Sequence, residues 1–457
     1  MKRNLLIGST VLALAFTGVG LAQASPTTEN VWTADVLMKV NGTMDARSVQ
    51  MSASGKGIYF YGGEYRDYDA ATNTWGNWQR LARNPKYLMS DGNARGDVCA
   101  TWWADFGVAA ACRTQGSSTW VKKNLYAGRG ASGTTVDVSA DGTSAMFTWW
   151  SPTGRRGKAI LNAGIYTFAS GTWSRPQVVS IRNDRGKLVS ILSQGISTPA
   201  GAGYVLAYVT GKKGRRNVLI PEATFQQVWT PGSGWGRQGE ILLAPPGGTP
   251  GPVAMAALAG DGTVTAAAFS HQPPANQDLP QHDWWIATTD AAGTFVNPVP
   301  AGAVTFGPRL SVCGQQITLA GKDYVNDYVG ALELSVLNGG SVLRHRIDMP
   351  DMFGVPGHNY GFGITPQTMT DGACGFAIVV EVDGIQDRGE EWEEDVQEAY
   401  TSVGYVDAVG ALQVSALSRL GTTRAYDGMN PGIAGWGQYA LIDYTDQTDA
   451  FTAIRKP

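Results

Sequence analysis

The chain has 457 residues, of which 43% are hydrophobic and 16% are charged, and its formal net charge is −3. A balance this close to neutral excludes binding to nucleic acid or to an anionic membrane through bulk positive charge, so we expect no nucleic-acid partner. Glycine accounts for 59 residues, a share well above the average, which indicates many tight turns.

Residues 1–24 have the three parts of a secretory signal peptide. Two basic residues precede an apolar stretch from Leu5 to about Ala22, and small residues at 22 and 24 suit a signal peptidase. The stretch is interrupted by glycine, serine and threonine and is short for a bilayer span of about 20 residues. We therefore predict cleavage near Ser25 and an exported protein, periplasmic, cell-surface or secreted, with no transmembrane segment after cleavage.

A turn signal returns eight times in residues 25–457: glycine after Asp, Ser, Ala or Cys, between two β-like runs. The first and last of these glycines, Gly55 and Gly435, are 380 residues apart. Seven intervals then average about 54 residues, the size of a four-stranded unit with its loops. No linker divides the region, so we predict one domain. The signals are Ser54-Gly55, Asp91-Gly92, Asp141-Gly142, Ala200-Gly201, Asp261-Gly262, Cys313-Gly314, Asp371-Gly372 and Ala434-Gly435.

The alternation of apolar and polar residues divides these units into strands. The third unit is predicted to have strands at 136–139, 144–150, 159–168 and 173–180, and the fifth at 253–259, 264–270, 284–289 and 295–299. The last unit has only three candidate strands, at 432–435, 438–445 and 450–455. Val31–Leu37 is extended in pattern and can supply the fourth.

Such an arrangement closes a ring and removes exposed sheet edges. We therefore predict an all-β protein, an eight-bladed β-propeller whose last blade is closed by the N-terminal strand. Seven blades is the alternative if the compact second unit or the terminal unit is misinterpreted.

Four cysteines in an oxidising compartment favour two disulfides. Cys99 and Cys112 lie in two strands joined by a short turn, where they can face each other. Cys313 and Cys374 are 61 residues apart, close to one repeat, and would join neighbouring units. A zinc site is the weaker alternative, because the paired C-x-x-C spacing is missing.

Charged residues gather in the loops between second and third strands, which share one face of a propeller. Two basic loops belong to adjacent units, and an acidic loop, Asp383–Asp395, belongs to a unit roughly opposite. This face is predicted to recognise a charged partner; the alternative is that the charges serve solubility. The basic residues are Arg155, Arg156 and Lys158 in the first loop and Lys212, Lys213, Arg215 and Arg216 in the second.

Metal binding is a weaker prediction. The acidic loop, with Asp383 and Asp387, offers carboxylates to Ca²⁺, although its spacing is not that of an EF-hand and Glu390–Ala399 could instead form a short solvated helix. His271 and His282 could contribute to a transition-metal site. No cofactor is predicted otherwise.

Aromatic residues open or precede the last strand of five units: Trp78, Trp120, Trp173, Trp235 and Phe295. Rings at these positions could stack on glycans. Packing between neighbouring blades is the preferred interpretation.

The blade pattern resembles exported bacterial β-propellers and, loosely, the sialidase-like propellers. Ser139-Ala140-Asp141-Gly142-Thr143 matches part of the S-x-D-x-G-x-T-W repeat of that family, and Arg346-Ile347 matches the start of its Arg-Ile-Pro motif, with Asp348 in place of proline. The resemblance covers nearly the whole mature chain and implies a propeller fold.

Catalytic signatures are missing from the sequence: there is no H-E-x-x-H, G-x-S-x-G or Walker loop. We therefore expect a binding or scaffold module of the cell envelope or extracellular space that engages a protein or polysaccharide through its charged loop face. The alternative is a carbohydrate-active hydrolase or lyase with its active site in the central funnel, so the sequence leaves open whether the protein is an enzyme.

Overall fold

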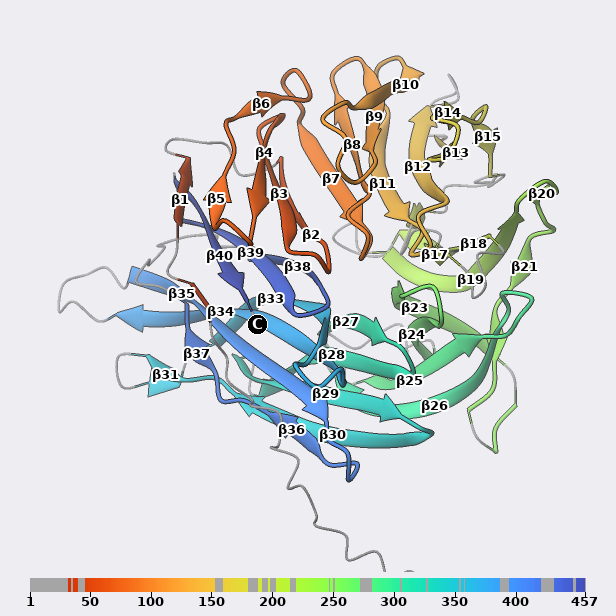
Figure 1. Ribbon diagram of the computed structural model, residues 1–457. Coiled ribbons are helices and arrows are strands. Elements are labelled where there is room, and N and C mark those ends of the chain that lie inside the picture. Colours follow the sequence, from red (N-terminus) through yellow and green to blue (C-terminus); the bar gives the residue numbers. More distant parts are fainter. Residues whose placement is uncertain are drawn as a thin grey trace, which may run out of the picture.

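The computed structural model describes most of the chain as a ring of β-sheets (Figure 1). Within the described residues the chain forms forty strands and no helix. The described residues are 32–33, 36–39, 46–152, 159–179, 188–190, 196–197, 203–213, 219–245, 247–249, 251–271, 282–304, 306–325, 328–352, 355–356, 358–386, 394–420, 431–446 and 449–456.

The strands form eight antiparallel blades, which confirms the predicted eight-bladed propeller. Blade 1 contains β2 (Arg47–Met51), β3 (Lys56–Tyr61), β4 (Glu64–Asp69), β5 (Thr74–Trp75) and β6 (Gln79–Arg80). Blade 2 contains β7 (Tyr87–Gly92), β8 (Val98–Ala104), β9 (Gly107–Arg113) and β10 (Val121–Ala127). Blade 3 contains β11 (Ser132–Val138), β12 (Ser144–Pro152), β13 (Ala159–Thr167), β14 (Thr172–Trp173) and β15 (Gln177–Val178). Blade 4 contains β16 (Leu188–Ser190), β17 (Ile196–Ser197), β18 (Tyr204–Lys213), β19 (Leu219–Thr230), β20 (Gly234–Trp235) and β21 (Gly239–Glu240).

The second half of the ring repeats this order, with a small extra hairpin between blades 6 and 7. Blade 5 contains β22 (Leu242–Leu243), β23 (Gly251–Gly260), β24 (Thr265–His271), β25 (His282–Thr289) and β26 (Phe295–Val304). Blade 6 contains β27 (Phe306–Cys313), β28 (Gln316–Val325), β29 (Tyr328–Asn338) and β30 (Ser341–Asp348), and the hairpin is β31 (Asp351–Met352) with β32 (Val355–Pro356). Blade 7 contains β33 (His358–Thr368), β34 (Cys374–Gln386), β35 (Glu394–Val406), β36 (Leu412–Val414) and β37 (Ser418–Arg419). Blade 8 contains β38 (Gly432–Trp436), β39 (Tyr439–Asp446), β40 (Asp449–Arg455) and β1 (Val36–Lys39).

The N-terminal segment closes the last blade, as predicted. β1 pairs antiparallel with β40, with Val36 opposite Thr452. Upstream, Trp32 forms a bridge with Arg455, and the Thr33 N–H donates to the Ile454 carbonyl at 2.9 Å. The two ends of the described chain therefore lie in one sheet, and the ring has no open seam.

Five of the eight predicted glycine turns are confirmed, since Gly55, Gly142, Gly262, Gly314 and Gly372 all have positive φ. Two predictions are wrong: Asp91-Gly92 ends β7, and Ala434-Gly435 lies inside β38. The true turns follow at Gly96 and Gly437, both with positive φ. Ala200-Gly201 lies outside the described residues.

The turn of blade 2 is displaced because a side chain organises it. The Asn93 side-chain oxygen accepts hydrogen bonds from the N–H groups of Gly96 and Asp97, both at 3.1 Å. Such local side-chain bonds define turns independently of a preceding Asp-Gly pair.

Two further expectations are corrected. The fourth strand predicted at 173–180 is two short pieces, β14 and β15, because the Ser174 hydroxyl between them, in place of a backbone carbonyl, accepts the Ile165 N–H at 2.9 Å. A short helix was a possible interpretation of Glu390–Ala399. From Glu394 onward the chain is instead strand β35.

The core lies between neighbouring blades and includes the aromatic rings near the outer strands. Trp120 packs edge-on against Phe60 and Tyr65 of blade 1, with ring centroids 5.9 and 5.4 Å apart. Trp173 packs against Phe147 of its own blade at 5.0 Å and against the core cluster that includes Val108 of blade 2. These contacts support the packing interpretation.

Both predicted disulfides are present. Cys99 and Cys112 are directly opposed on β8 and β9. Cys313 at the end of β27 is bonded to Cys374 at the start of β34, which joins blades 6 and 7. The Cys313–Cys374 bond joins the first-to-second-strand turn of blade 6 to that of blade 7.

Candidate functional site

The two faces of the ring differ in what they carry. In every blade the first strand begins at the face that holds the blade connectors and the second-to-third-strand loops, which we call the loop face. The first strand ends at the opposite face, which holds the first-to-second-strand turns and which we call the turn face. Sequence-distant loops therefore share one surface, as predicted.

Most of the predicted site residues lie outside the described residues: Arg155, Arg156, Lys158, Arg215, Arg216 and Asp387. The backbone of Lys212 and Lys213 ends β18, and that of Asp383 lies near the end of β34, both at the loop face. His271 ends β24 and His282 begins β25, so these two backbone positions also lie at the loop face.

Among the described residues, no group of three or more His, Cys, Asp or Glu side chains is close enough to hold a metal ion. The same part of the chain contains no helix long and apolar enough to cross a membrane.

The described loop face of blade 2 exposes an aromatic side chain at a hairpin tip. Phe106, between β8 and β9, is 71% exposed. The Arg129 guanidinium carbon lies 5.6 Å from the centre of its ring, a cation–π distance. The Phe106 carbonyl accepts a hydrogen bond from the Gly128 N–H at 2.9 Å, so the hairpin tip is held against the connector to blade 3.

Basic side chains lie at this tip and along the blade. Lys86 forms an ion pair with Asp105, next to Phe106, and donates its backbone N–H to the Trp103 carbonyl at 3.0 Å. On the outer strand, the Lys122 ammonium donates to the Leu81 carbonyl at 2.8 Å. Five exposed cations and one exposed carboxylate, Asp105, thus lie on blade 2 and the connectors that flank it, and contacts place Lys86 and Arg129 at the tip itself. We call this surface the blade 2 rim: Arg83, Lys86, Tyr87, Asp105, Phe106, Lys122, Lys123 and Arg129.

The blade 2 rim was not predicted from the sequence. Its residues come from a blade connector, a hairpin tip and an outer strand, and none of them forms a charge run. The one available signal was an aromatic residue in a turn, Asp105-Phe106-Gly107, where packing does not require one.

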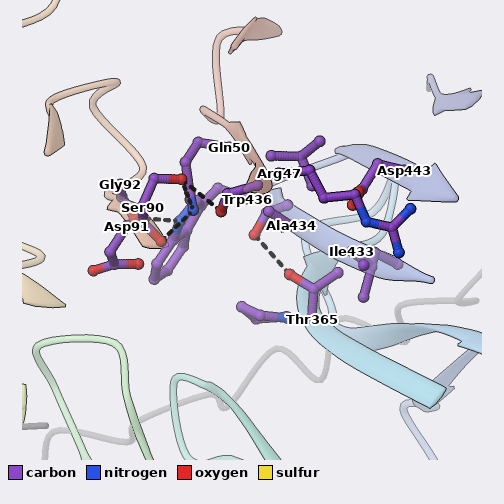
Figure 2. Close-up of a pocket in the computed structure, with 15 residues that line it drawn as sticks. Arg47, Gln50, Ser90, Asp91, Gly92, Thr365, Ile433, Ala434, Trp436 and Asp443 are labelled. Atoms are coloured by element: carbon purple, nitrogen blue, oxygen red, sulfur yellow. Dashed lines mark hydrogen bonds and ion pairs between the residues drawn. The ribbon is translucent and has the colours of Figure 1, made fainter. Parts of the chain in front are cut away.

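A cavity of about 420 Å³ lies in the central channel between the first strands of blades 7, 8, 1 and 2 (Figure 2). We call it the channel pouch. Arg47 and Asp443 lie at its loop-face end, where the Arg47 Nε is 3.3 Å from Asp443 Oδ2 and both side chains are at most 9% exposed. Burial raises the pKa of Asp443, and the Arg47 guanidinium partly offsets this rise.

Trp436 lies at the turn-face end of the channel pouch. Its indole N–H donates to the Gly92 carbonyl at 3.2 Å, so blades 8 and 2 are joined there. The contact spans blades 8, 1 and 2 and forms part of the turn-face end of the channel pouch.

The wall of the channel pouch is polar. The Ser90 hydroxyl donates to Ser48 Oγ at 2.8 Å, and the Gln50 amide donates to the Ser90 carbonyl at 2.9 Å. On the other side, the Thr365 hydroxyl donates to the Gly435 carbonyl at 3.1 Å. These groups are neutral and can both donate and accept hydrogen bonds.

Two carboxyl groups with perturbed pKa values lie on adjacent first strands. Asp91 of β7 lines the channel pouch, and its Oδ2 accepts the Val138 N–H of β11 at 2.6 Å. Burial raises the pKa of Asp91 to about 6, against the opposing hydrogen bonds from Val138 and Gly92. Burial, and then the charge of Asp91, raises the pKa of neighbouring Asp137. Carboxyl groups whose pKa is raised by burial are candidates for general acids.

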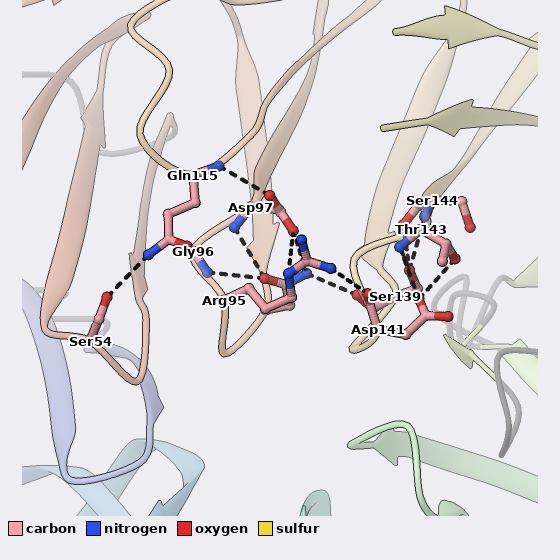
Figure 3. A network of polar contacts seen from close by, with 10 residues as sticks. Ser54, Arg95, Gly96, Asp97, Gln115, Ser139, Asp141, Thr143 and Ser144 are labelled. Carbon is pink, nitrogen blue, oxygen red and sulfur yellow. Dashed lines mark hydrogen bonds and ion pairs between the residues drawn. The ribbon is translucent and has the colours of Figure 1, made fainter. Parts of the chain in front are cut away.

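The turn face is occupied by contacts between blades (Figure 3). The Arg95 guanidinium donates to the Asp141 carbonyl at 2.7 Å, and the Asn93 amide donates to the Ser139 carbonyl at 3.0 Å. Asp141 Oδ1 accepts the Thr143 N–H at 2.9 Å within its own turn. The motif that resembles the sialidase-like repeat therefore has a structural role here.

The second motif of that resemblance lies on an outer strand. Arg346 of β30 pairs with Glu333 at 2.9 Å and with Asp348 at 2.8 Å, and also contacts Asp323. It does not line the channel pouch. The resemblance to sialidase-like propellers stays a prediction.

No family model and no curated protein matches this chain. Among solved structures, the WD40 domain of SCAP from fission yeast is similar with a TM-score of 0.51 and 8% identity, over 94% of this chain and 97% of that one. The Dos1 propeller is similar with a TM-score of 0.46 and 8% identity, over 92% and 94%. The polysaccharide lyase Uly1 is similar with a TM-score of 0.42 and 8% identity, over 92% of each chain. The first match supports the propeller fold, and at this identity none bears on ligand or activity.

Proposed function

We propose that this protein is an exported binding module that engages an anionic polysaccharide of the cell envelope or extracellular space through its loop face. The observation that carries the proposal is the blade 2 rim, where Arg129 lies against the exposed ring of Phe106, Lys86 pairs with the adjacent Asp105, and three further exposed cations lie on the same blade or its connector. The predicted signal peptide, residues 1–24, and the two disulfides are consistent with export.

A polysaccharide fits the blade 2 rim better than a protein does. A specific protein interface has a core of buried apolar and aromatic side chains, whereas the exposed large apolar side chains of this surface are Phe106 and Tyr87 only. A sugar ring needs one aromatic face to stack on, and the carboxylates or sulfates of an acidic polymer need spaced cations.

The two basic loops predicted from the sequence extend the proposal to blades 3 and 4. A polymer that crosses the loop face would contact Arg155, Arg156 and Lys158 after leaving the blade 2 rim, and then the loop that contains Lys212, Lys213, Arg215 and Arg216. Contacts spread along a polymer add up through multivalency. The acidic loop of blade 7 would repel the same polymer and so direct its path.

The experiment is affinity electrophoresis of the mature protein in gels that contain polygalacturonate or neutral dextran. We expect retardation by the acidic polymer only, weakened about tenfold in Phe106→Ala/Arg129→Ser, a loss of about 1.4 kcal/mol. Arg155, Arg156, Arg215 and Arg216 changed together to Ser should weaken it further. Val409→Ser/Arg175→Ser, a pair of exposed positions outside the loop face, is the matched control.

Equal retardation of the Phe106/Arg129 variant and the control would overturn the role of the blade 2 rim. No retardation by any acidic polymer, together with crosslinking of the protein to an envelope protein, would replace the polysaccharide with a protein partner.

A carbohydrate-active hydrolase or lyase is the second candidate function, favoured by the two carboxyl groups Asp91 and Asp137. Carboxyl groups with raised pKa values serve as general acids in glycan cleavage. Incubation with acidic and neutral glycans should then release reducing ends or unsaturated sugars, and Asp91→Asn should abolish the release. No release by the unchanged protein would exclude this function for the glycans tested.

A further inference from the structure

We propose that the channel pouch is a separate binding site for one uncharged sugar residue. The inference rests on the proposed function in one respect, since the ligand is again a carbohydrate. It concerns different residues, however, and it can fail while binding at the blade 2 rim holds.

Polar contacts bound the channel pouch at both ends. Trp436 and Gly92 are hydrogen-bonded at its turn-face end, and Arg47 and Asp443 are paired at its loop-face end. The volume of about 420 Å³ lies at the lower end of the range of about 300–1,000 Å³ for ligand pockets, which suits a single small ligand.

The charges that line the channel pouch argue for a neutral ligand. Arg47 and Asp443 face each other at 3.3 Å, and both side chains are at least nine-tenths buried. The guanidinium is thereby compensated within the protein. An anionic sugar would have to compete with Asp443 for it, and removing one partner of a buried ion pair is costly.

The hydrogen-bonding groups match the hydroxyls of a sugar. Each hydroxyl in the wall both donates and accepts, and the bonds described use only part of this capacity. Ser48 Oγ accepts from Ser90, so its own proton is available to a ligand. The Thr365 hydroxyl donates to Gly435, so its oxygen can accept.

Two further residues of the wall, Trp436 and Asp91, would orient a bound sugar. The Trp436 ring supplies an aromatic surface at the turn-face end, while its N–H is already used. Asp91 lines the same space, and its Oδ2 accepts the Val138 N–H at 2.6 Å. Because its pKa is raised to about 6, it accepts hydrogen bonds from a ligand at pH 8 and can also donate one at pH 5.

The experiment is saturation-transfer-difference NMR of the mature protein with glucose, galactose, N-acetylglucosamine and glucuronate. We expect transfer to at least one neutral sugar and less to glucuronate. Ser48→Leu removes a hydroxyl from the wall and places a bulky apolar side chain in the channel pouch, and it should remove the signal. Ser170→Leu, the same change at an exposed turn of blade 3, should leave it unchanged.

Folding of each variant is checked by circular dichroism. Thr365→Val keeps the side-chain volume and removes only the hydroxyl, so it tests the site even if Ser48→Leu does not fold, and it should weaken the signal severalfold. The inference is overturned if no neutral sugar gives a signal, if Ser48→Leu and Thr365→Val leave the signal intact, or if glucuronate is preferred.

Polygalacturonate retardation of the same variants separates the two proposals. Retardation unchanged in Ser48→Leu, together with loss of the sugar signal, supports two independent sites. A sugar signal that persists in Phe106→Ala/Arg129→Ser supports the channel pouch even if the polymer proposal fails.

Discussion

Trp436 donates its indole N–H to the carbonyl of Gly92 at 3.2 Å, across 344 residues of sequence. The bond joins the first strands of blades 8 and 2, while β2 of blade 1 contacts both β38 and β7. Three blades are therefore held at one point near the channel. This contact requires the closed ring, because blade 8 is formed by both ends of the chain.

We expect Trp436→Phe to lower the free energy of unfolding by about 1 kcal/mol more than Trp75→Phe does. Both changes replace an indole ring with the smaller phenyl ring at a half-buried position. The indole N–H of Trp75, however, is buried without a hydrogen-bond partner in the structure, so its loss breaks no bond. Urea unfolding of the two variants measures the difference. Equal losses would mean that the bond to Gly92 contributes nothing net.

The two disulfides are expected to stabilise the fold unequally. The chain-entropy model gives about 4 kcal/mol for Cys313–Cys374 and about 3 kcal/mol for Cys99–Cys112, because their separations are 61 and 13 residues. Replacing each pair by alanine and comparing denaturant midpoints checks this order. A greater loss in the Cys99/Cys112 variant would show that native packing, and not loop closure, dominates.

The ring could be predicted from the sequence because its signal is local and repeated. Glycine with positive φ is required at each tight turn, so Gly55, Gly142, Gly262, Gly314 and Gly372 mark the blades directly. Even the two wrong turns fell within a few residues of the true ones. The closing strand was predictable because the last unit was one strand short.

The channel pouch could not be predicted, because no local pattern encodes it. Arg47 and Asp443 are far apart in sequence and meet only where blade 8 closes against blade 1. Asp91 was assigned to a turn, and its position on β7 instead directs it into the channel. Groups that meet through ring geometry leave no spacing to recognise.

The raised pKa of Asp91 predicts a fold that is less stable at higher pH. The native carboxyl group, with a pKa of about 6, holds its proton more tightly than the unfolded one. Between about pH 4 and pH 6 the native state therefore binds more protons, and stability falls as pH rises through this window. Asp91→Asn removes the ionisation and should be more stable than the unchanged protein at pH 8, by an order of 2 kcal/mol, and equal to it at pH 4.

Urea unfolding at pH 4 and pH 8 measures this difference. Asp407→Asn is the contrasting control. Hydrogen bonds, of which the one from the Ala411 N–H has the largest effect, lower the pKa of Asp407. The contribution of Asp407 to stability is therefore present at high pH and lost as pH falls. That variant should lose stability at pH 8. If Asp91→Asn behaves in the same way, the burial of Asp91 does not disfavour its charge.

Arg455 is expected to hold blade 8, which closes the ring, against blade 7. It lies on β40, is 8% exposed, and donates to Gln367 Oε1 of blade 7 at 2.9 Å and to the Gln438 carbonyl at 3.2 Å. Arg455→Met fills similar space but removes the donor from the buried Gln367 Oε1 and from the partly buried Gln438 carbonyl. We expect a loss of about 2–3 kcal/mol, together with faster amide hydrogen exchange in β38–β40 and β33, because the contact between blades 7 and 8 opens first. Arg175→Met, at an exposed position of blade 3, should change neither. Uniform acceleration around the whole ring would instead show that blade 8 has no separate opening and that the propeller unfolds as one unit.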